Sequence, residues 1–330
     1  MARLSGVSVA TVSRVFNGYT DVHPETRERV LAAARELDYA PSAAARTLVG
    51  RRSQLVGVVL NTGYEHPDIE HPFFQDVLVG LKHGVGELGY DLLLFATEQP
   101  GAYLRRARHH RVDGLVLWGV DRDDPDLPPL VEARMPLVAI DLEVVGPCAT
   151  WISSDSVGGA RLAVRHLHEL GHTRIATITG LVGTKPGRER LEGYRQELTS
   201  LGLEVSPEYE TNGDFYADSG EAAMRALLTQ AERPTAVFAA SDEMAVGAAG
   251  AARSAGVRVP EDISIIGFDD SRIAALLDPP LTTVRQDRAS LGIAAARTVA
   301  GTIEHPDEPP TPSILPVELV VRRSSAPPPG

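Results

Sequence analysis

Short apolar runs alternate with longer amphipathic segments from residue 55 onward, and this alternation constrains the fold more than any other feature of the 330-residue chain. Such alternation is typical of parallel strands that are buried on both faces and connected by helices. The runs are LVGVVL, DLLLFA, GLVLWG, PLVAI, RIATITG, AVFAAS and ISIIGF. They predict an α/β fold with two doubly wound parallel-sheet lobes, lobe 1 from about 54–153 and 288–314 and lobe 2 from about 154–284 and 315–323.

Polar residues that directly follow these runs are candidates for a binding site, because ligands of doubly wound sheets bind beyond the carboxyl ends of the strands. Asp141 follows PLVAI, Asp269 follows IIGF, and Ser241 and Asp242 follow VFAA. Each can accept or exchange hydrogen bonds with hydroxyl groups. The alternative is structural, with Asp242 or Asp269 capping the helix that follows its strand.

Arginine and aromatic residues extend this candidate site. Arg190 in GRERL can bind two acceptor atoms at once. Phe73, Phe74 and Phe215 offer faces for a sugar ring or a base, although Phe74 could equally be a core residue. A ligand of hydroxyl groups, most simply a sugar, is expected between the lobes, and a nucleobase could use much the same side chains.

The first 53 residues differ from the rest in charge. They contain eight Arg and five acidic residues, which gives a net charge of +3. Because the whole chain has a net charge of −12, the other 277 residues carry a net charge of −15. Within them, GVSVATVSRVFNG predicts a two-turn helix with Ser8 as its N-cap and Asn17-Gly18 at its end, followed by a third helix from Pro24. Small polar groups and one Arg suit a helix in the major groove. An amphipathic hairpin that packs on the body explains the spacing equally well.

Motifs along nearly the whole chain resemble the lactose-repressor (LacI-type) family of bacterial regulators. The opening helices carry the likeness, and it continues through HPFF, GGARLAVRHLHELGHTRI, GRERLEGYR, AASDEMAVGA and ISIIGFDDS…PPLTTVRQD. The resemblance implies a helix-turn-helix DNA-binding domain at 1–40, a hinge helix and linker at 41–53, and an effector-binding and dimerisation domain at 54–330. The lobes of that last domain are then of the type I periplasmic-binding-protein kind.

The resemblance also assigns DNA-contacting residues in the first domain. Val9 and Ala10 open the recognition helix and contact bases, Thr11 and Ser13 contact phosphates, and Arg14 contacts base or backbone. The remaining DNA-binding positions are Ser8, Asn17 and Leu48.

The hinge helix corresponds to PSAAARTLVG, residues 41–50. Its three alanines allow two such helices to approach closely, and Leu48 is a candidate apolar wedge between base pairs of the minor groove. A helix of one to two turns is marginal alone and is expected to fold on DNA. Without the resemblance, this segment would be interpreted as a plain linker.

One departure from the family concerns the first helix, of which Met1–Ser5 corresponds only to the end. The missing turns normally bury apolar residues against the next two helices, so the head is expected to be poorly ordered and to bind DNA weakly. We interpret this as a start codon placed too far downstream, or as trimming. A gel shift against a chain extended upstream by roughly eight residues tests the idea.

Three motifs suggest chemistry that their context does not support. HELGH, residues 168–172, matches a zinc-protease pattern, but Gly171 is expected to end the helix before the second histidine. GVGELG precedes a strand, which inverts the order of a dinucleotide fingerprint. GLVGTKPG has Pro186 after Lys185, where a phosphate loop needs Ser or Thr. No metal, no cofactor and no catalytic residue is predicted.

The sequence therefore predicts a ligand-responsive transcriptional regulator, a repressor that binds double-stranded operator DNA as a homodimer. Neither a secretory signal nor an apolar run of membrane-spanning length occurs, and Cys148 is the single cysteine, so a cytoplasmic protein with no membrane partner is expected. The alternatives are a free sugar-binding protein of a transport system, a purine-responsive corepressed regulator, and an enzyme. The sign of the ligand response is left open.

Overall fold

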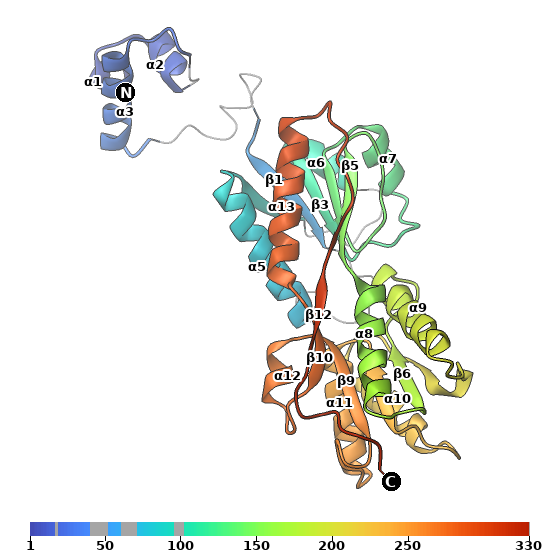
Figure 1. Cartoon of the computed structure of the whole chain (residues 1–330). Helices are drawn as coiled ribbons and strands as arrows, with labels where there is room; N and C mark the ends of the chain where they lie inside the picture. Colours follow the sequence, from blue (N-terminus) through green and yellow to red (C-terminus); the bar gives the residue numbers. More distant parts are fainter. Residues whose placement is uncertain (17–18, 40–51, 61–70, 96–101, 330) are drawn as a thin grey trace. The chain divides into compact units, whose positions relative to one another are not determined.

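The computed structural model describes residues 1–16, 19–39, 52–60, 71–95 and 102–329. The chain forms two compact units, Met1–Gln54 and Leu55–Gly330. The predicted fold class, a helical N-terminal part followed by two α/β lobes, is confirmed (Figure 1). None of the described helices is both long and apolar enough to cross a membrane.

The N-terminal unit contains three helices, α1 (Ala2–Ser5), α2 (Val9–Phe16) and α3 (Pro24–Glu36). The Ser8 hydroxyl accepts a hydrogen bond from Thr11 N at 3.0 Å, which caps α2 as expected for this residue type. Gly6 ends α1 with a φ of 65°, where glycine is favoured. Val15 and Val30 are buried between the helices. The predicted hinge helix, with Leu48, lies outside the described residues, as does Asn17.

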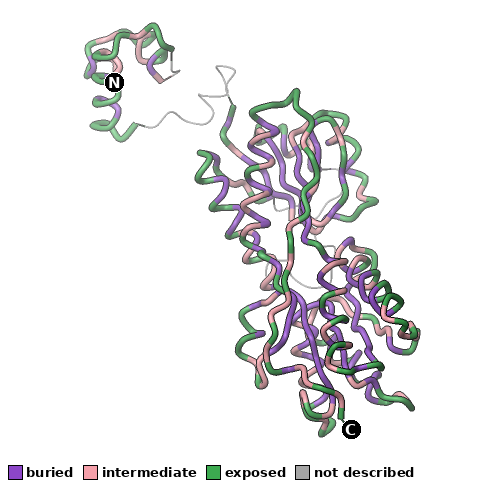
Figure 2. The backbone as a smooth tube through the Cα atoms, in the orientation of Figure 1, coloured by how far each residue is buried: buried purple, intermediate pink, exposed green. Residues whose placement is uncertain are grey.

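Lobe 1 is built on a six-stranded parallel sheet with the order β11-β5-β4-β3-β1-β2. Helices α5 (Pro72–Glu87) and α13 (Arg288–Glu304) pack on one face, and α6 (Tyr103–His110) and α7 (Leu127–Glu132) pack on the other. The buried backbone of these strands is visible in Figure 2. The strands are β1 (Leu55–Leu60), β2 (Asp91–Phe95), β3 (Gly114–Trp118), β4 (Leu137–Ile140), β5 (Ala149–Ser154) and β11 (Ser313–Leu315).

Lobe 2 repeats this plan with the strand order β12-β10-β9-β8-β6-β7, in which only β12 runs antiparallel to its neighbour. Helices α8 (Ser156–Glu169) and α9 (Lys185–Ser200) cover one face, and α10 (Ala217–Leu228) and α11 (Asp242–Ser254) cover the other. The short helices η1 (Pro207–Tyr209) and α12 (Arg272–Leu276) complete the lobe. The strands are β6 (Ile175–Thr179), β7 (Glu210–Asn212), β8 (Ala236–Ala239), β9 (Ser264–Asp269), β10 (Thr282–Gln286) and β12 (Val317–Val320).

The chain passes between the lobes three times, from β5 to α8, from β10 to α13 and from β11 to β12 (Figure 1). Arg288 fixes the second passage: its Nε and Nη2 donate to Asp76 Oδ2 of α5 at 3.0 and 2.7 Å, and its Nη1 donates to the carbonyl of Asp269 in lobe 2. One guanidinium thus connects a lobe 1 helix to the end of a lobe 2 strand. Such a set of crossovers permits the lobes to move as rigid bodies.

Close packing of α5 on α13 depends on glycine. A Cβ placed on Gly292 would lie 2.2 Å from the carbonyl oxygen of Val77. The two backbones therefore meet almost directly, which anchors the returning helix α13 to lobe 1.

Candidate functional site

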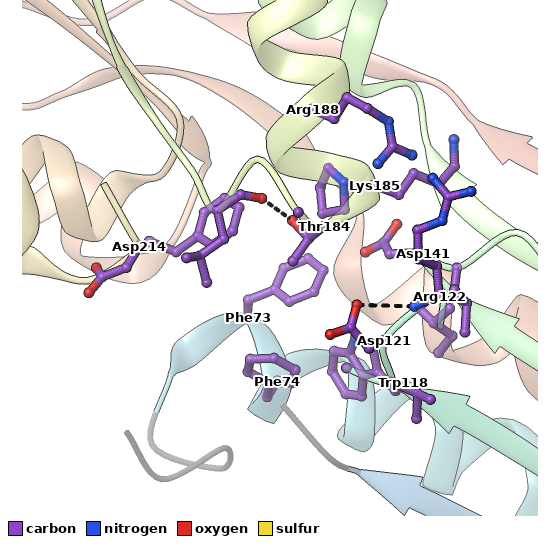
Figure 3. A pocket seen from close by; sticks show the side chains of 18 of the residues that line it. Phe73, Phe74, Trp118, Asp121, Arg122, Asp141, Thr184, Lys185, Arg188 and Asp214 are labelled. Atoms are coloured by element: carbon purple, nitrogen blue, oxygen red, sulfur yellow. Dashed lines mark hydrogen bonds between the residues drawn. The ribbon is translucent and has the colours of Figure 1, made fainter. Parts of the chain in front are cut away.

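A cavity of about 520 Å³ lies between the two lobes of the second unit. Its lining comes from the carboxyl ends of β3, β4 and β9 and from the N-termini of α5 and α9 (Figure 3). This is the position where doubly wound sheets bind ligands. Of the eight side chains predicted to bind a ligand, six line the cavity: Phe73, Phe74, Asp141, Arg190, Phe215 and Asp269.

Three aromatic rings form a wall on the lobe 1 side. The ring centroids of Phe74 and Trp118 are 4.5 Å apart, and Phe73 meets both rings edge-on at 5.8 and 5.6 Å. Phe73 and Phe74 also pack against the lobe 1 core, so the core role and the lining role of Phe74 coexist. The wall offers apolar faces of fixed orientation to a flat or ring-shaped ligand.

Arg190 of α9 is a buried cation on the lobe 2 side, with a side chain only 5% exposed. Its guanidinium lies 3.7 Å from the ring centroid of Phe268, and its Nη1 donates to the carbonyl of Ala240. Burial lowers the pKa of Arg190, an effect that the carboxylates of Asp269 and Asp141 oppose. Its Nε has no hydrogen-bond partner among the described residues, so one strong donor in the cavity wall is unsatisfied.

Two carboxylates accompany this arginine. Asp141 Oδ1 accepts a hydrogen bond from Ser153 Oγ at 2.6 Å, and burial raises the pKa of Asp141. Asp269 Oδ1 accepts from Gln286 Nε2 and lies 3.8 Å from Arg190 Nη1. Both aspartates have positive φ values, 57° and 116°, which non-glycine residues adopt only at a cost. The end of each strand is thereby turned toward the cavity.

Ser241 and Asp242 lie behind the cavity wall rather than on it. Ser241 Oγ caps α11 by accepting from Met244 N at 3.1 Å, and it donates to the carbonyl of Phe215 at 2.9 Å. Asp242 accepts from Ser271 N and Thr283 Oγ1, both at 2.6 Å. Ser241 therefore positions Phe215, and Asp242 holds the loop that follows β9.

Several lining residues were not among the predicted site. Trp118 is the last residue of β3 within the run GLVLWG, so its place at the end of a buried strand was a usable signal. Lys185 occurs in the rejected phosphate-loop motif and begins α9. Other lining residues that the sequence did not single out are His71, Asp121, Arg122, Asp123, Asp124, Glu143, Arg188, Asp214 and Tyr216.

The two histidines of HELGH do not share a helical face. His168 lies in α8, whereas His172 follows Gly171, whose φ of 102° ends the helical path. The imidazole of His172 is buried and hydrogen-bonded to Thr235 Oγ1 at 2.8 Å and to the carbonyl of Ala326 at 2.8 Å. This histidine therefore ties the C-terminal segment to lobe 2.

The second candidate site is the outer face of α2 in the N-terminal unit. Ser8, Val9, Ala10, Ser13 and Arg14 are exposed, and Thr11 is partly exposed. Val9 is 75% exposed, so its methyl groups lie on this outer face. This face combines methyl groups, hydroxyls and one guanidinium, which are the groups that contact base edges and phosphates.

The Arg14 side chain contacts two other residues of the N-terminal unit. Its guanidinium pairs with the Asp21 carboxylate and lies 5.1 Å from the ring centroid of Tyr19. Both charged side chains are about half exposed, at 51% and 54%. A phosphate or a guanine would therefore compete with Asp21 for the same guanidinium.

The chain matches known families at both ends. Residues 1–42 match the model described as bacterial regulatory proteins, lacI family, and residues 164–325 match the model described as a periplasmic binding protein-like domain. The HTH-type transcriptional regulator CelR of Thermobifida fusca is 40% identical, over 98% of this chain and 96% of its own length. The ribose operon repressor of Escherichia coli (strain K12) is 37% identical, over 93% and 92%.

Solved structures of transcriptional regulators are also similar to this chain. A complex of the transcriptional regulator CelR with cellobiose has a TM-score of 0.76 at 37% identity, covering 98% of each chain. The lac repressor dimer bound to operator and the anti-inducer ONPF has a TM-score of 0.85 at 30% identity, covering 98% of this chain and 97% of that one. The chain belongs to the LacI family of bacterial regulatory proteins.

Proposed function

We propose that the chain is a LacI-family transcriptional repressor whose affinity for a double-stranded DNA operator is set by a neutral sugar in the cavity between its lobes. The relatives that match it over nearly their full lengths are transcriptional regulators. One observation carries the ligand part of the proposal. An aromatic wall from lobe 1 faces a buried arginine of lobe 2 whose Nε lacks a partner among the described residues.

A sugar satisfies both sides of such a cavity at once. The C–H face of a pyranose or furanose ring can lie on Trp118 or Phe74, while its hydroxyls pair with Arg190, Asp141 and Asp269. Two named relatives support this class, since CelR forms a complex with cellobiose and the ribose operon repressor is named for a sugar operon.

Charge favours a neutral sugar over a phosphorylated one. Among the described lining residues, seven are acidic and four are basic. The buried arginine is already flanked by two carboxylates, so a dianionic phosphate would enter a field of its own sign. The acidic residues are Asp121, Asp123, Asp124, Asp141, Glu143, Asp214 and Asp269, and the basic ones are Arg122, Lys185, Arg188 and Arg190.

The acidic residues of the cavity are proposed to bind rather than to catalyse. Ser153 donates to Asp141, and Gln286 donates to Asp269, so both carboxylates have fixed partners. The relatives are regulators, which supports the absence of an enzymatic role. Multiple turnover of any glycoside that binds the cavity would contradict it.

On the DNA side, the exposed face of α2 is proposed to read the operator, with Val9 and Ala10 toward bases and Ser8, Thr11, Ser13 and Arg14 toward phosphates or bases. The roles of Asn17 and Leu48 stay predictions. A homodimer would present two such helices to a near-palindromic site. The lac repressor is a dimer in its operator complex.

A thermal-shift screen of the full chain tests the ligand. We expect neutral sugars, with cellobiose and ribose as first probes, to raise the Tm. At a hundred times its Kd a ligand stabilises the folded state by about 2.7 kcal/mol, which is a rise of roughly 5 to 10 °C for a domain of this size. Matched sugar phosphates are expected to give no shift.

Arginine variants on one helix make the screen specific. Arg190→Met removes the buried guanidinium and is expected to abolish the shift. Arg195→Met, five residues along α9, removes a half-exposed guanidinium that pairs with Glu210 away from the cavity lining and is expected to retain the shift. A shift with purines in place of sugars would favour a purine-responsive regulator, a role for which the aromatic wall is also suited. A hit that survives Arg190→Met would place the ligand elsewhere.

A further inference from the structure

Lys185 crosses from one lobe to the other. It is the first residue of α9 in lobe 2, and its ammonium lies 3.3 Å from Glu143 Oε1 and 4.7 Å from the ring centroid of Trp151, both in lobe 1. The side chain is only 6% exposed, although lysine is almost never buried without partners. The Lys185 ammonium has a further partner in its own lobe, the carboxylate of Glu189, one turn along α9.

His71 makes a second crossing. Its Nδ1 accepts from Phe73 N at 3.2 Å as the N-cap of α5 in lobe 1, so its proton is on Nε2. That Nε2–H donates to the carbonyl of Phe215 in lobe 2 at 3.2 Å, and the ring meets Tyr216 edge-on with centroids 5.2 Å apart. The imidazole thus caps a helix of one lobe and binds the backbone of the other.

The contacts that Lys185 and His71 make between the lobes can break and re-form at a small energetic cost. If the lobes part, Lys185 keeps Glu189 as its partner and gives up only Glu143 and the face of Trp151. His71 keeps its role as a helix cap and gives up one hydrogen bond. Losing these contacts leaves no buried charge without a partner. Lobe separation therefore avoids the large desolvation penalty of breaking a fully buried ion pair.

We propose that Lys185 and His71 are positioning residues that clasp the two lobes, and that this clasp sets ligand affinity and its coupling to operator binding. The proposal deepens the proposed function and rests on it for the ligand and the operator. Both residues line the cavity, so lobe closure and the ligand act on the same surfaces. Weakening the clasp is expected to lower ligand affinity roughly three- to thirty-fold, the range spanned by one partly exposed ion pair and one cation–π contact.

Trp151 reports on the clasp without any ligand or DNA. The chain has two tryptophans, Trp118 and Trp151, so Trp118→Phe leaves Trp151 as the single fluorophore. The informative variant is His71→Asn in that background, because Asn retains an N-cap but is too short to reach Phe215. Among the described residues, His71 makes no hydrogen bond or ring contact with Trp151, so greater acrylamide quenching of Trp151 would report lobe opening rather than local exposure.

In the full chain we expect His71→Asn and Glu143→Gln each to raise the acrylamide quenching constant of Trp151 roughly twofold and to increase the radius of gyration in small-angle scattering. Lys185→Arg keeps the charge and is expected to preserve the original values. Glu189→Gln removes the partner within the same lobe and serves as the matched control, with no opening expected.

Unchanged quenching and scattering in both His71→Asn and Glu143→Gln would overturn the clasp. Circular dichroism of each variant separates opening from loss of fold, and if one of these two variants misfolds, the other still tests the clasp. If the lobes open in these variants but the parent chain binds none of the sugars, the clasp proposal stands and the proposed function is wrong. The two failures are thus distinguishable.

Discussion

Asp242 shows how a single residue beside the site can make the whole fold depend on pH. It is fully buried, and its carboxyl oxygens accept from Ser271 N and Thr283 Oγ1. Burial raises the pKa of Asp242 from its ordinary 3.8 to about 7, and the nearby Asp269 carboxylate adds to the effect. The folded chain therefore holds a proton on Asp242 at pH values where the unfolded chain has lost it.

This shift fixes the sign of a stability prediction. The stabilisation by the protonated form is complete below pH 3.8 and is lost as the pH rises through about 7. In Asp242→Asn the amide can accept from Ser271 and donate to Thr283, and it does not titrate. We expect the parent to lose stability relative to Asp242→Asn between about pH 4 and 7, at about 1.4 kcal/mol for each unit over which the protonation differs. Parallel urea-unfolding curves of the two proteins at each pH measure the difference.

A constant difference between the two proteins across that range would mean that Asp242 is ionised in the folded chain throughout. Thr283→Val in the parent serves as a control, because it removes one hydrogen bond without removing the titrating group. Its pH dependence should keep the same sign as that of the parent.

The sequence predicts a cavity-lining residue where that residue lies at the carboxyl end of a buried strand. Asp141 and Asp269 follow buried runs, and both line the cavity. Ser241 also follows a run, but α11 begins directly after it, and the helix uses its hydroxyl as an N-cap. Lys185 could not be found from the sequence, because its partners Glu143 and Trp151 lie on the other lobe. Contacts that depend on how two lobes meet leave no local signal.

At the scale of elements, most strands that the sequence revealed are buried on both faces, and the edge strand β2, from the run DLLLFA, is the exception. Strands β1, β3, β4, β8 and β9 are nearly continuous apolar runs, and each has neighbours on both sides. Strand β12, with the sequence VELV, is the edge strand of the lobe 2 sheet, and its neighbour β10, with the sequence TTVRQ, contains a single apolar residue. An edge strand is half solvated, so its pattern is weaker and its partner is not implied by its composition.

The pairing of α8 with α9 carries an element-scale prediction. The Glu197 carboxylate of α9 is fully buried and accepts from Arg161 Nε at 2.8 Å and Arg165 Nε at 2.7 Å, both on α8. Glu197→Gln keeps the volume but replaces one acceptor oxygen with a donor that faces an arginine. We expect a loss of about 1 to 3 kcal/mol in the free energy of unfolding, read from urea curves, because the two arginines are half exposed and water can partly compensate.

A matched surface variant controls for charge alone. Glu221→Gln removes an exposed partner of Arg225 within α10, and such pairs contribute at most about 1 kcal/mol. Equal losses in the two variants would show that the Glu197 pair acts only as a surface pair and does not hold α8 to α9.

At the scale of the whole molecule, one chain carries a DNA-reading unit and a ligand cavity, and their coupling is constrained by thermodynamics. If ligand changes operator affinity by some factor, operator must change ligand affinity by the same factor. For the proposed repressor we expect a factor of about 5 to 150. The lobes are joined by three crossovers and by Arg288, so the ligand can act by changing how the lobes meet.

Two titrations at one fixed salt concentration test this equality, because phosphate contacts make operator affinity strongly salt-dependent. The first measures operator Kd by fluorescence anisotropy with and without saturating sugar. The second measures sugar Kd by calorimetry with and without saturating operator. Arg14→Ala is expected to weaken operator binding while leaving sugar Kd in the absence of DNA unchanged. In a separate salt series, it is expected to reduce the salt slope of operator binding by about one. Factors that differ between the two titrations beyond error would show that sugar and operator bind different assemblies of the chain, and that a single two-state regulator does not describe it.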